Sequence, residues 1–362
     1  MSKAADQLKN ALKLREEQHL LREASVHSGL IDFASNDYLG FAKRPIHITA
    51  PAGAGASRLI TGYSASLERL EFRLADVYES SHATLFNSGF EANHGLFDML
   101  TSQGIHVLYD EFSHASIRSG LTGKRVKTWA FKHNSVADLK EKLGKLDGPV
   151  VVVTEGLFSM NGTIAPLHEI VALKNEFDFA LVVDEAHSTG TFGRGLTGLS
   201  GMLNLTEDID IRIHTFGKSL GSQGACIVSD GTIHAALQNF CKPLIYSTAP
   251  SPLFVASVRL AHDSLSELES SQRQLHENIA HFQRRITENN TFQQGLHGPI
   301  QWWKGSSVPV VMKKTEQLKN EGFDVVAIRP PTVPEGNEGI RICLHAFNNY
   351  TQIDALLQGF ND

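Results

Sequence analysis

Cysteine is scarce in this sequence, with three residues among 362. Cys226, Cys241 and Cys343 are isolated, odd in number and without the short spacings of a metal site. We therefore expect reduced core residues rather than a disulfide framework, as is usual for a cytoplasmic protein. The 17 histidines form no ligand cluster in the sequence either, so no metal site is predicted.

Long apolar runs and an excess of basic residues are also lacking. The apolar run at 150–153 is too short to cross a bilayer and indicates a buried strand. A net charge of −6 argues against a nucleic-acid surface. Basic residues near the N-terminus alternate with acidic ones such as Asp6 and Glu16, and no apolar signal core follows. We expect a cytoplasmic protein with neither membrane nor nucleic-acid partners.

What is present is an alternation of short apolar segments with amphipathic ones. Leu67, Leu70 and Leu74 recur at helical spacing in a helix expected over 64–78. Strands are predicted near 83–87, 105–109, 125–131, 149–154, 179–183, 211–215 and 223–228. Helices are predicted at 90–101, 114–121, 135–145 and 166–176. Continuous apolar strands separated by helices indicate an α/β fold with a mostly parallel central sheet, flanked by helices on both faces.

The two ends of the chain have a different pattern. Periodic leucines predict a helix over 4–23, followed by a short strand at 30–33. After Pro250 a long helical stretch runs to about 290, and a final helix ends the chain. Strands are predicted between them at 308–312, 324–328 and 339–344. We predict an N-terminal segment, a large domain and a smaller C-terminal α+β domain, with bounds 1–48, 49–250 and 251–362.

Two predicted strands end in polar residues suited to one cofactor. LVVDEAHSTG (181–190) carries Asp184 and His187, and IHTFGKSLG (213–221) carries Thr215 and Lys218. Ligands of an open parallel sheet bind beyond the carboxyl ends of its strands, so these side chains should converge. A lysine can form a Schiff base with pyridoxal phosphate, while a carboxylate pairs with its pyridine nitrogen. The alternative is an ordinary sheet with a surface aspartate and lysine.

A turn at 87–90, with the sequence Asn-Ser-Gly-Phe, lies between a predicted strand and the next helix. Free backbone N–H groups at a helix N-terminus can bind a phosphate. Ser-Gly at such a position is also an ordinary helix cap. Beside the aspartate and lysine, the turn becomes a candidate for the cofactor phosphate.

With these residues placed, the chain resembles the α-oxoamine synthases, a branch of the fold type I pyridoxal-phosphate enzymes. The matching segments are SNDYLG (35–40), ITGYSASLERLE (60–71), NSGFEAN (87–93), SHAS (113–116), VTEGLFSMNGTIAPL (153–167), VDEAHSTG (183–190), TFGKSLG (215–221), LIYSTAPSP (244–252) and AIRPPTVPEGNEGIRICL (327–344). The last segment is most similar to members that act in biotin biosynthesis. The resemblance implies a pyridoxal-phosphate transferase fold and a homodimer with its sites near the subunit interface.

The resemblance also implies roles for individual residues in cofactor binding. Lys218 would hold the cofactor covalently, Asp184 would pair with the pyridine nitrogen, and His187 would bind the phenolic oxygen. His114 would stack on the ring and touch the substrate. The phosphate and the remaining hydrogen bonds would be served by Gly89, Phe90, Ser159 and Thr215. The alternatives are a helix cap for His114 and a turn-stabilising role for Ser159. Glu155 is expected to have a positioning role.

Further roles implied by the resemblance concern the substrates and the neighbouring subunit. Arg329 would pair with the amino-acid carboxylate, unless it is only a surface arginine. Thr332 and Arg22 are additional candidates for substrate contact. Thr248 would reach the cofactor phosphate of the neighbouring subunit. Alternatively, Ser247 and Thr248 cap the helix that begins near 252.

The reaction implied is the decarboxylative condensation of L-alanine with an acyl thioester, pimeloyl-CoA or pimeloyl-acyl carrier protein. Other branch members, namely glycine C-acetyltransferase, 5-aminolevulinate synthase and serine palmitoyltransferase, share the chemistry and differ in substrates. An aminotransferase or a non-catalytic homologue is a more distant alternative. The segment 41–52 is shorter than the resemblance leads us to expect, which predicts a shortened or missing helix there.

Overall fold

The computed structural model describes residues 2–17, 20–21, 24, 26–27, 29–286, 292–330 and 332–361. Its largest feature is a seven-stranded sheet with the order β2-β8-β7-β6-β5-β3-β4. The strands are β2 (His82–Phe86), β3 (His106–Asp110), β4 (Thr128–Phe131), β5 (Val150–Glu155), β6 (Ala180–Asp184), β7 (Ile211–Thr215) and β8 (Ala225–Ser229). Six of these strands run in the same direction, and β8, between β2 and β7, runs opposite to them. The mostly parallel sheet expected from the sequence is confirmed.

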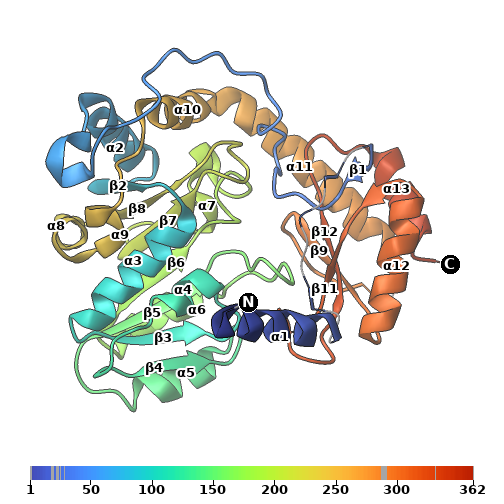
Figure 1. Cartoon of the computed structure of the whole chain (residues 1–362), viewed down its shortest axis with the longest axis horizontal. Helices are drawn as coiled ribbons and strands as arrows, with labels where there is room; N and C mark the ends of the chain where they lie inside the picture. The colour runs from blue at the N-terminus through green and yellow to red at the C-terminus, as the bar shows by residue number, and fades with distance from the viewer. Residues whose placement is uncertain are drawn as a thin grey trace.

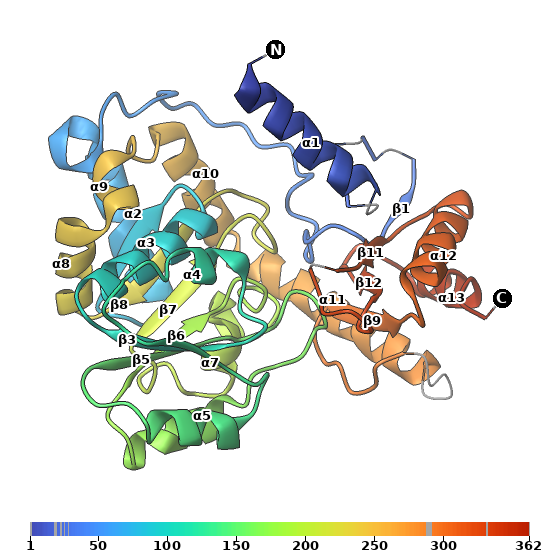
Figure 2. The same cartoon turned by 60° about the horizontal axis from the view of Figure 1, so that its bottom comes forward.

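The strands are mostly apolar because helices cover both faces of the sheet. In β5, Val152 packs in one core with Leu139 of α5 (Val136–Leu143), whereas Val151 packs in the other with Leu96 of α3 (Gly89–Ser102). Successive side chains of a strand point to opposite faces, so both sets are buried. Figure 2 shows α3 and α4 (Ala115–Ser119) on one side of the sheet and α5 on the other.

The remaining helices of this larger unit surround the sheet. They are α2 (Ala65–Val77), α6 (Leu167–Ala172), α7 (Gly198–Met202), α8 (Gly231–Phe240), α9 (Lys242–Tyr246) and α10 (Pro252–Asp263). Three shorter turns of helix are η1 (Arg58–Gly62), η2 (Leu173–Asn175) and η3 (Arg194–Leu196). The strand-to-helix connections at the carboxyl edge of the sheet carry the candidate site.

A smaller unit contains most of the C-terminal part of the chain (Figure 1). Its antiparallel sheet has the order β11-β12-β9, formed by β9 (Ile300–Lys304), β11 (Val326–Ile328) and β12 (Gly339–Cys343). The helices beside it are α11 (Leu265–Arg285), α12 (Val308–Asn320) and α13 (Tyr350–Gln358). Near the N-terminus, α1 (Lys3–Glu17) is followed by β1 (Ile31–Asp32), which pairs with β10 (Phe323–Asp324). The smaller α+β unit expected from the sequence is present.

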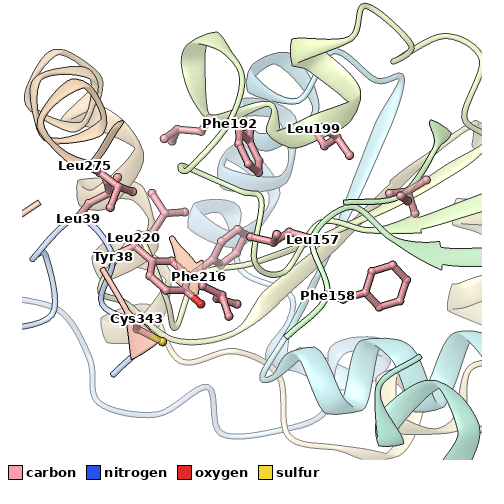
Figure 3. Close-up of a cluster of buried hydrophobic side chains, with 14 of the residues drawn as sticks. Tyr38, Leu39, Leu157, Phe158, Phe192, Leu199, Phe216, Leu220, Leu275 and Cys343 are labelled. Atoms are coloured by element: carbon pink, nitrogen blue, oxygen red, sulfur yellow. The ribbon is translucent and has the colours of Figure 1, made fainter. Parts of the chain in front are cut away.

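One hydrophobic core joins the two units. Leu275 of α11 belongs to the same buried cluster as Leu39, Phe192 and Phe216. Figure 3 shows this part of the core, in which Leu275 lies beside Leu39 and Tyr38 lies beside Phe216. Helix α10 packs against α2 of the larger unit. The bounds 1–48, 49–250 and 251–362 remain predictions.

The predicted strand at 308–312 is wrong, because these residues begin helix α12. Short apolar runs do not distinguish a strand from a buried helical turn. Ser307 lies at the N-cap and Pro309 in the first turn, where proline is tolerated because its missing N–H has no intrahelical partner. The strand β9 and the helix α8, neither of which was predicted, complete the two units.

Two predicted helices are longer than the observed ones. The helix expected over 4–23 ends at Glu17, and Leu20 and Leu21 are not helical. The single helix expected from about 250 to 290 is divided at Ser264 into α10 and α11. Residues 41–52 contain no helix and cross between the units as the long connection before η1 (Figure 1), as expected from their shortness.

Cys226, Cys241 and Cys343 are buried and unpaired. None of the described helices combines the length and the apolar character needed to cross a lipid bilayer.

Candidate active site

The residues predicted from the two strand ends line one cavity of about 490 Å³. Asp184 is the last residue of β6 and pairs in register with Ile213 of the adjacent strand β7. Lys218 follows the end of β7 by three residues. The other predicted residues in the lining are Gly89, Phe90, His114, Ser159, His187 and Thr215. The structure therefore brings together eight of the predicted side chains at the carboxyl edge of the sheet.

The Asp184 carboxylate is buried and held by two donors. The Asn93 side-chain amide donates to Oδ2 at 2.7 Å, and the Ala186 backbone N–H donates to Oδ1 at 2.9 Å. Asn93 also donates to Ser116 Oγ at 3.1 Å. Asn93 was not among the predicted site residues, although it is a polar residue one turn into an otherwise mostly apolar helix.

Lys218 is half-buried, and its ammonium group has few partners. Burial lowers the pKa of Lys218, while the nearby carboxylates of Asp184 and Glu155 raise it and limit the shift. The Nζ atom lies 3.5 Å from Thr215 Oγ1. A lysine with a lowered pKa is neutral more often and can act as a nucleophile and a base near pH 7.

His187 is buried beside Tyr38, with 2.7 Å between the tyrosine hydroxyl and Nδ1. Burial holds the pKa of His187 well below its usual value, and the positive charges of Lys218 and Arg341 add to this effect. The ring is therefore neutral near pH 7, and its Nδ1 is occupied. Within the described part of the chain no hydrogen bond occupies its Nε2, and the residue lines the cavity. Tyr38 belongs to the SNDYLG segment but was not among the predicted site residues.

The alternative role of His114 as a helix cap is confirmed, and its stacking on a cofactor ring stays a prediction. His114 is the N-cap of α4, where Nδ1 accepts from the Ser116 N–H at 3.2 Å, and its side chain lines the cavity. Burial lowers the pKa of His114. The His114 backbone N–H donates to Glu155 Oε1 at 2.6 Å. Burial, followed by the charge of Asp184, raises the pKa of Glu155 well above its usual value. This contact fits the positioning role expected of Glu155.

The N-terminus of α3 forms one wall of the cavity. Gly89 lies so close to β7 that a β-carbon there would come within 2.7 Å of Thr215 Cγ2. The absence of a side chain leaves the first backbone N–H groups of the helix accessible, and these groups have no intrahelical acceptor. Ser88 caps the helix by accepting from the Glu91 N–H at 3.1 Å. The wall thus combines a helix cap with an anion-binding geometry.

Arg341, from β12 of the smaller unit, reaches the same cavity. Its Nη1 donates to the Ser159 carbonyl at 3.2 Å and its Nη2 to the Ala34 carbonyl at 3.3 Å. Its buried Nε has no hydrogen-bond partner among the described residues. Arg341 was not among the predicted site residues, although an arginine inside the otherwise apolar strand GIRIC is a signal in the sequence. Arg329 is not in the lining, and its Nη1 lies 3.7 Å from the sulfur of Met312.

Three further predicted residues lie elsewhere. Thr332 lines a neighbouring cavity described below. Arg22 lies outside the described residues. Thr248 is exposed, and its carbonyl accepts from the Asn87 side-chain amide at 3.1 Å, next to the candidate site. The alternative role of Ser247 and Thr248 as helix caps is wrong, because Ser251 caps α10 by accepting from the Phe254 N–H.

A larger cavity of about 990 Å³ lies at the opposite, amino ends of the strands, near Val150, Ala180 and Ile211. No predicted site residue lines it. Among the residues that the structure describes, no group of three or more histidine, cysteine or acidic side chains is placed to hold a metal ion.

The family model for aminotransferase class I and II matches residues 28–360. An 8-amino-7-oxononanoate synthase from Emericella nidulans is 35% identical over 98% of this chain and 94% of the relative. The enzyme of the same name from Chromohalobacter salexigens is 34% identical over 91% of this chain and 88% of the relative.

Solved structures show the same fold. Serine palmitoyltransferase from S. paucimobilis, solved with a bound PLP-myriocin aldimine, superposes with a TM-score of 0.87 at 26% identity, covering 98% of this chain and 96% of that one. An 8-amino-7-oxononanoate synthase from Francisella tularensis has a TM-score of 0.78 at 24% identity, covering 92% of this chain and 97% of that one, and supports the fold alone. The chain therefore belongs to the aminotransferase class I and II family and, among its pyridoxal-phosphate enzymes of fold type I, to the α-oxoamine synthases.

Proposed function

We propose that the protein condenses L-alanine with pimeloyl-CoA, or with pimeloyl-acyl carrier protein, and releases the thiol and CO₂. The product would be 8-amino-7-oxononanoate, an intermediate of biotin biosynthesis. The observation that carries this proposal is the cavity in which Lys218, Asp184 and His187 converge, in a chain whose relatives include enzymes of that name.

The residues present fit pyridoxal phosphate, the cofactor of this family. When bound, this cofactor supplies an electron sink for the carbanion at the amino-acid Cα. We propose that Lys218 holds the cofactor and moves the Cα proton, helped by its lowered pKa. Asp184, oriented by Asn93, would keep a proton on the pyridine nitrogen. Neutral His187 would bind the phenolic oxygen, and His114 would lie on the ring face.

The remaining contacts would position the two charged ends of the small molecules. The α3 N-terminus at Gly89 and Phe90 would bind the phosphate, with Ser159 and Thr215 completing the hydrogen bonds. Arg341 lines the cavity, its buried Nε has no partner among the described residues, and it is a candidate for the amino-acid carboxylate. Arg329 remains the other candidate. Thr332 and Arg22 remain proposed substrate contacts.

A substrate panel tests this function. The enzyme loaded with cofactor is incubated with L-alanine, glycine or L-serine, each combined with acetyl-, succinyl-, pimeloyl- or palmitoyl-CoA, and thiol release is measured. L-Serine belongs in the panel because serine palmitoyltransferase has a very similar fold. We expect the highest kcat/KM for L-alanine with pimeloyl-CoA. A higher value for another pair would assign the protein to that reaction.

The attachment of the cofactor is tested separately. Borohydride reduction of the loaded protein followed by peptide mapping should label Lys218. Labelling of a different lysine would contradict the role proposed for the residue.

We also propose that the enzyme is a homodimer. Large apolar side chains are exposed around η1, including Ile60 (75%), Phe72 (71%) and Tyr246 (80%). Helix α9, which carries Tyr246, packs against η1, and η1 is tied to α2 by the ion pair between Arg58 and Glu71. Apolar residues gathered in this way are typical of a subunit interface. A twofold interface here would bring Thr248 toward the partner's site.

Sedimentation of the Ile60→Glu and Tyr246→Glu variants tests the dimer. We expect both substitutions to weaken it, whereas Met202→Glu on α7, also exposed, should not. Thr248→Ala should lower the affinity for the cofactor. A fully active monomer would contradict the proposal. Because the three cysteines are buried and unpaired, we propose a cytoplasmic location.

A further inference from the structure

A second cavity of about 790 Å³, here called the side cavity, lies beside the candidate active site. Met160 lines both cavities, so they adjoin at this side chain. One wall comes from the larger unit, at Phe112 and Arg118. The opposite wall comes from Phe292, Trp302 and Lys304 of the smaller unit and from a neighbouring loop that contributes Pro330, Thr332, Val333, Pro334, Glu335 and Asn337.

The walls of the side cavity combine apolar surface with positive charge. Apolar side chains include Phe112, Met160, Phe292, Trp302 and Val333. The two cations, Arg118 and Lys304, are exposed. Within the described part of the chain, neither cation forms an ion pair with a carboxylate. A cavity with apolar walls and two cations that form no ion pair suits a chain-like ligand that carries an anionic group.

Two carboxylates, Glu111 and Glu335, also line the side cavity. Glu111 accepts a hydrogen bond from the His133 backbone N–H at 2.8 Å, which fixes its direction. Neither carboxylate is within ion-pair distance of a described cation, so Arg118 and Lys304 keep their donors available.

Helix α4 links the side cavity to the reaction centre. His114 caps this helix and lines the active site, and Arg118 lies four residues later. Side chains at this spacing share one face of a helix, about one turn apart. Burial has the largest effect and lowers the pKa of His114, whereas the charge of Asp184 raises it. The charges of Lys218 and Arg118 lower this pKa further. Of these four effects on the pKa of His114, that of the Arg118 charge is the smallest.

We propose that Arg118 and Lys304 form an anion clamp that binds the acyl thioester while its reacting carbonyl lies in the active site. The apolar walls would hold the chain between the thioester and the anionic group. That group is either the terminal carboxylate of a dicarboxylic acyl chain or a phosphate of the thiol carrier. The inference rests on the proposed function and adds the residues that select the acyl donor.

Three thioesters test the clamp and distinguish the two sources of the anion. Pimeloyl-CoA has both a terminal carboxylate and phosphates, heptanoyl-CoA lacks the carboxylate, and pimeloyl-N-acetylcysteamine lacks the phosphates. In the Arg118→Gln/Lys304→Gln double variant we expect the KM for pimeloyl-CoA to rise about 10- to 100-fold, as for lost charge-assisted hydrogen bonds. The KM for L-alanine should not change. Lys313→Gln, an exposed lysine of α12 outside the cavity, is the matched control.

The pattern across the three thioesters decides the outcome. If the clamp binds the carboxylate, the variant loses the preference for pimeloyl-CoA over heptanoyl-CoA. If it binds a phosphate, both CoA thioesters are affected equally and the N-acetylcysteamine thioester is not. An unchanged KM for all three, or an equal effect of Lys313→Gln, overturns the clamp.

A binding measurement separates the clamp from the proposed function. A non-hydrolysable CoA thioether with a terminal carboxylate should change the fluorescence of Trp302, which lines the side cavity, and Trp302→Phe should remove the change. Weaker binding to the double variant supports the clamp even if L-alanine and pimeloyl-CoA are not turned over. Equal binding of the thioether to the unchanged protein and to the double variant overturns the clamp, even if L-alanine and pimeloyl-CoA are turned over.

Discussion

At the scale of single residues, the charge of Asp184 matters as much as its position. Asparagine has nearly the same shape, so Asp184→Asn should preserve packing and cofactor binding while removing the partner of the pyridinium. We expect kcat to fall by at least about 100-fold, as for other lost electrostatic stabilisers of a transition state. Absorbance after dialysis measures retained cofactor, and thiol release measures kcat. Near-normal turnover would show that Asp184 does not pair with the ring.

Asp178→Asn is the matched control for this substitution. Asp178 is exposed and lines the cavity at the opposite end of the strands. Turnover should be unchanged, so a fall in this variant would indicate a general loss of folded protein.

Two arginines compete for the amino-acid carboxylate. Arg341 lines the active site, and its Nε has no partner among the described residues, whereas Arg329 lies outside the lining beside Met312. A planar guanidinium binds a carboxylate through two parallel hydrogen bonds, which lysine cannot reproduce. We expect Arg341→Lys to raise the KM for L-alanine about tenfold or more, with a much smaller effect on the acyl thioester.

The paired variant Arg329→Lys should have the smaller effect on L-alanine. A larger rise in the KM for L-alanine in Arg329→Lys than in Arg341→Lys would assign the carboxylate contact to Arg329, as predicted from the sequence. Thermal unfolding of both variants is needed, because Arg341 also binds the Ser159 and Ala34 carbonyls.

At the scale of elements, a buried ion pair joins η1 to α2 and β2. Glu71 of α2 accepts from Arg58 Nη1 at 3.0 Å, from the Tyr63 hydroxyl at 3.0 Å and from the Leu85 backbone N–H at 2.7 Å. Removing the carboxylate would leave the buried Arg58 charge unpaired. We expect Glu71→Ala to lower the free energy of unfolding by about 3–5 kcal/mol.

Urea denaturation measures this loss, with Glu68→Ala as the control. Glu68 is exposed on the same helix, and its removal should change stability by less than about 0.5 kcal/mol. Equal effects of the two substitutions would show that the ion pair does not hold these elements together.

The elements best predicted from the sequence are those whose pattern has one interpretation. The run at 150–153 and the strand before Asp184 are continuously apolar. The polar residues that follow two of the predicted strands placed Asp184 and Lys218 at one edge of the sheet. The strand predicted at 308–312 is wrong because four apolar residues around Pro309 fit a strand and a helix equally well. Arg341 was missed because its role depends on how β12 of the smaller unit meets the larger one. Such contacts between distant segments leave no periodic signal.

At the scale of the whole molecule, the active site depends on both units. Asp184 and Lys218 come from the larger sheet, and Arg341 comes from the smaller one. The side cavity lies between the same two units. Because Leu275 and Phe216 share one buried cluster, the two units are held together by core packing. Substrate-binding geometry and overall stability are therefore coupled.

Acid should destabilise this core through its buried histidines. His262 is fully buried, with Tyr78 Oη 3.0 Å from Nε2 and the Val258 carbonyl 2.7 Å from Nδ1. Burial lowers the pKa of His262 to about 4, and burial also holds the pKa of His214 well below its usual value. The unfolded chain binds a proton at a pKa of about 6.5. The folded state is therefore favoured fully above pH 6.5, and this stability is lost as the pH falls toward 4.

For His262 alone, the loss across this window amounts to about 3 kcal/mol. Protonation of carboxylates destabilises the fold only at lower pH, and Asp32 is an example. Burial raises the pKa of Asp32, but hydrogen bonds from Ser35 and Ala34 and the charge of His345 outweigh burial and lower this pKa to about 2. Thermal unfolding of the cofactor-loaded protein should thus show a falling midpoint between pH 6.5 and 4. His262→Gln should flatten this slope, whereas His168→Gln, on the exposed surface, should not. A slope that is the same in all three proteins would mean that protonation of His262 does not limit the acid stability of the fold.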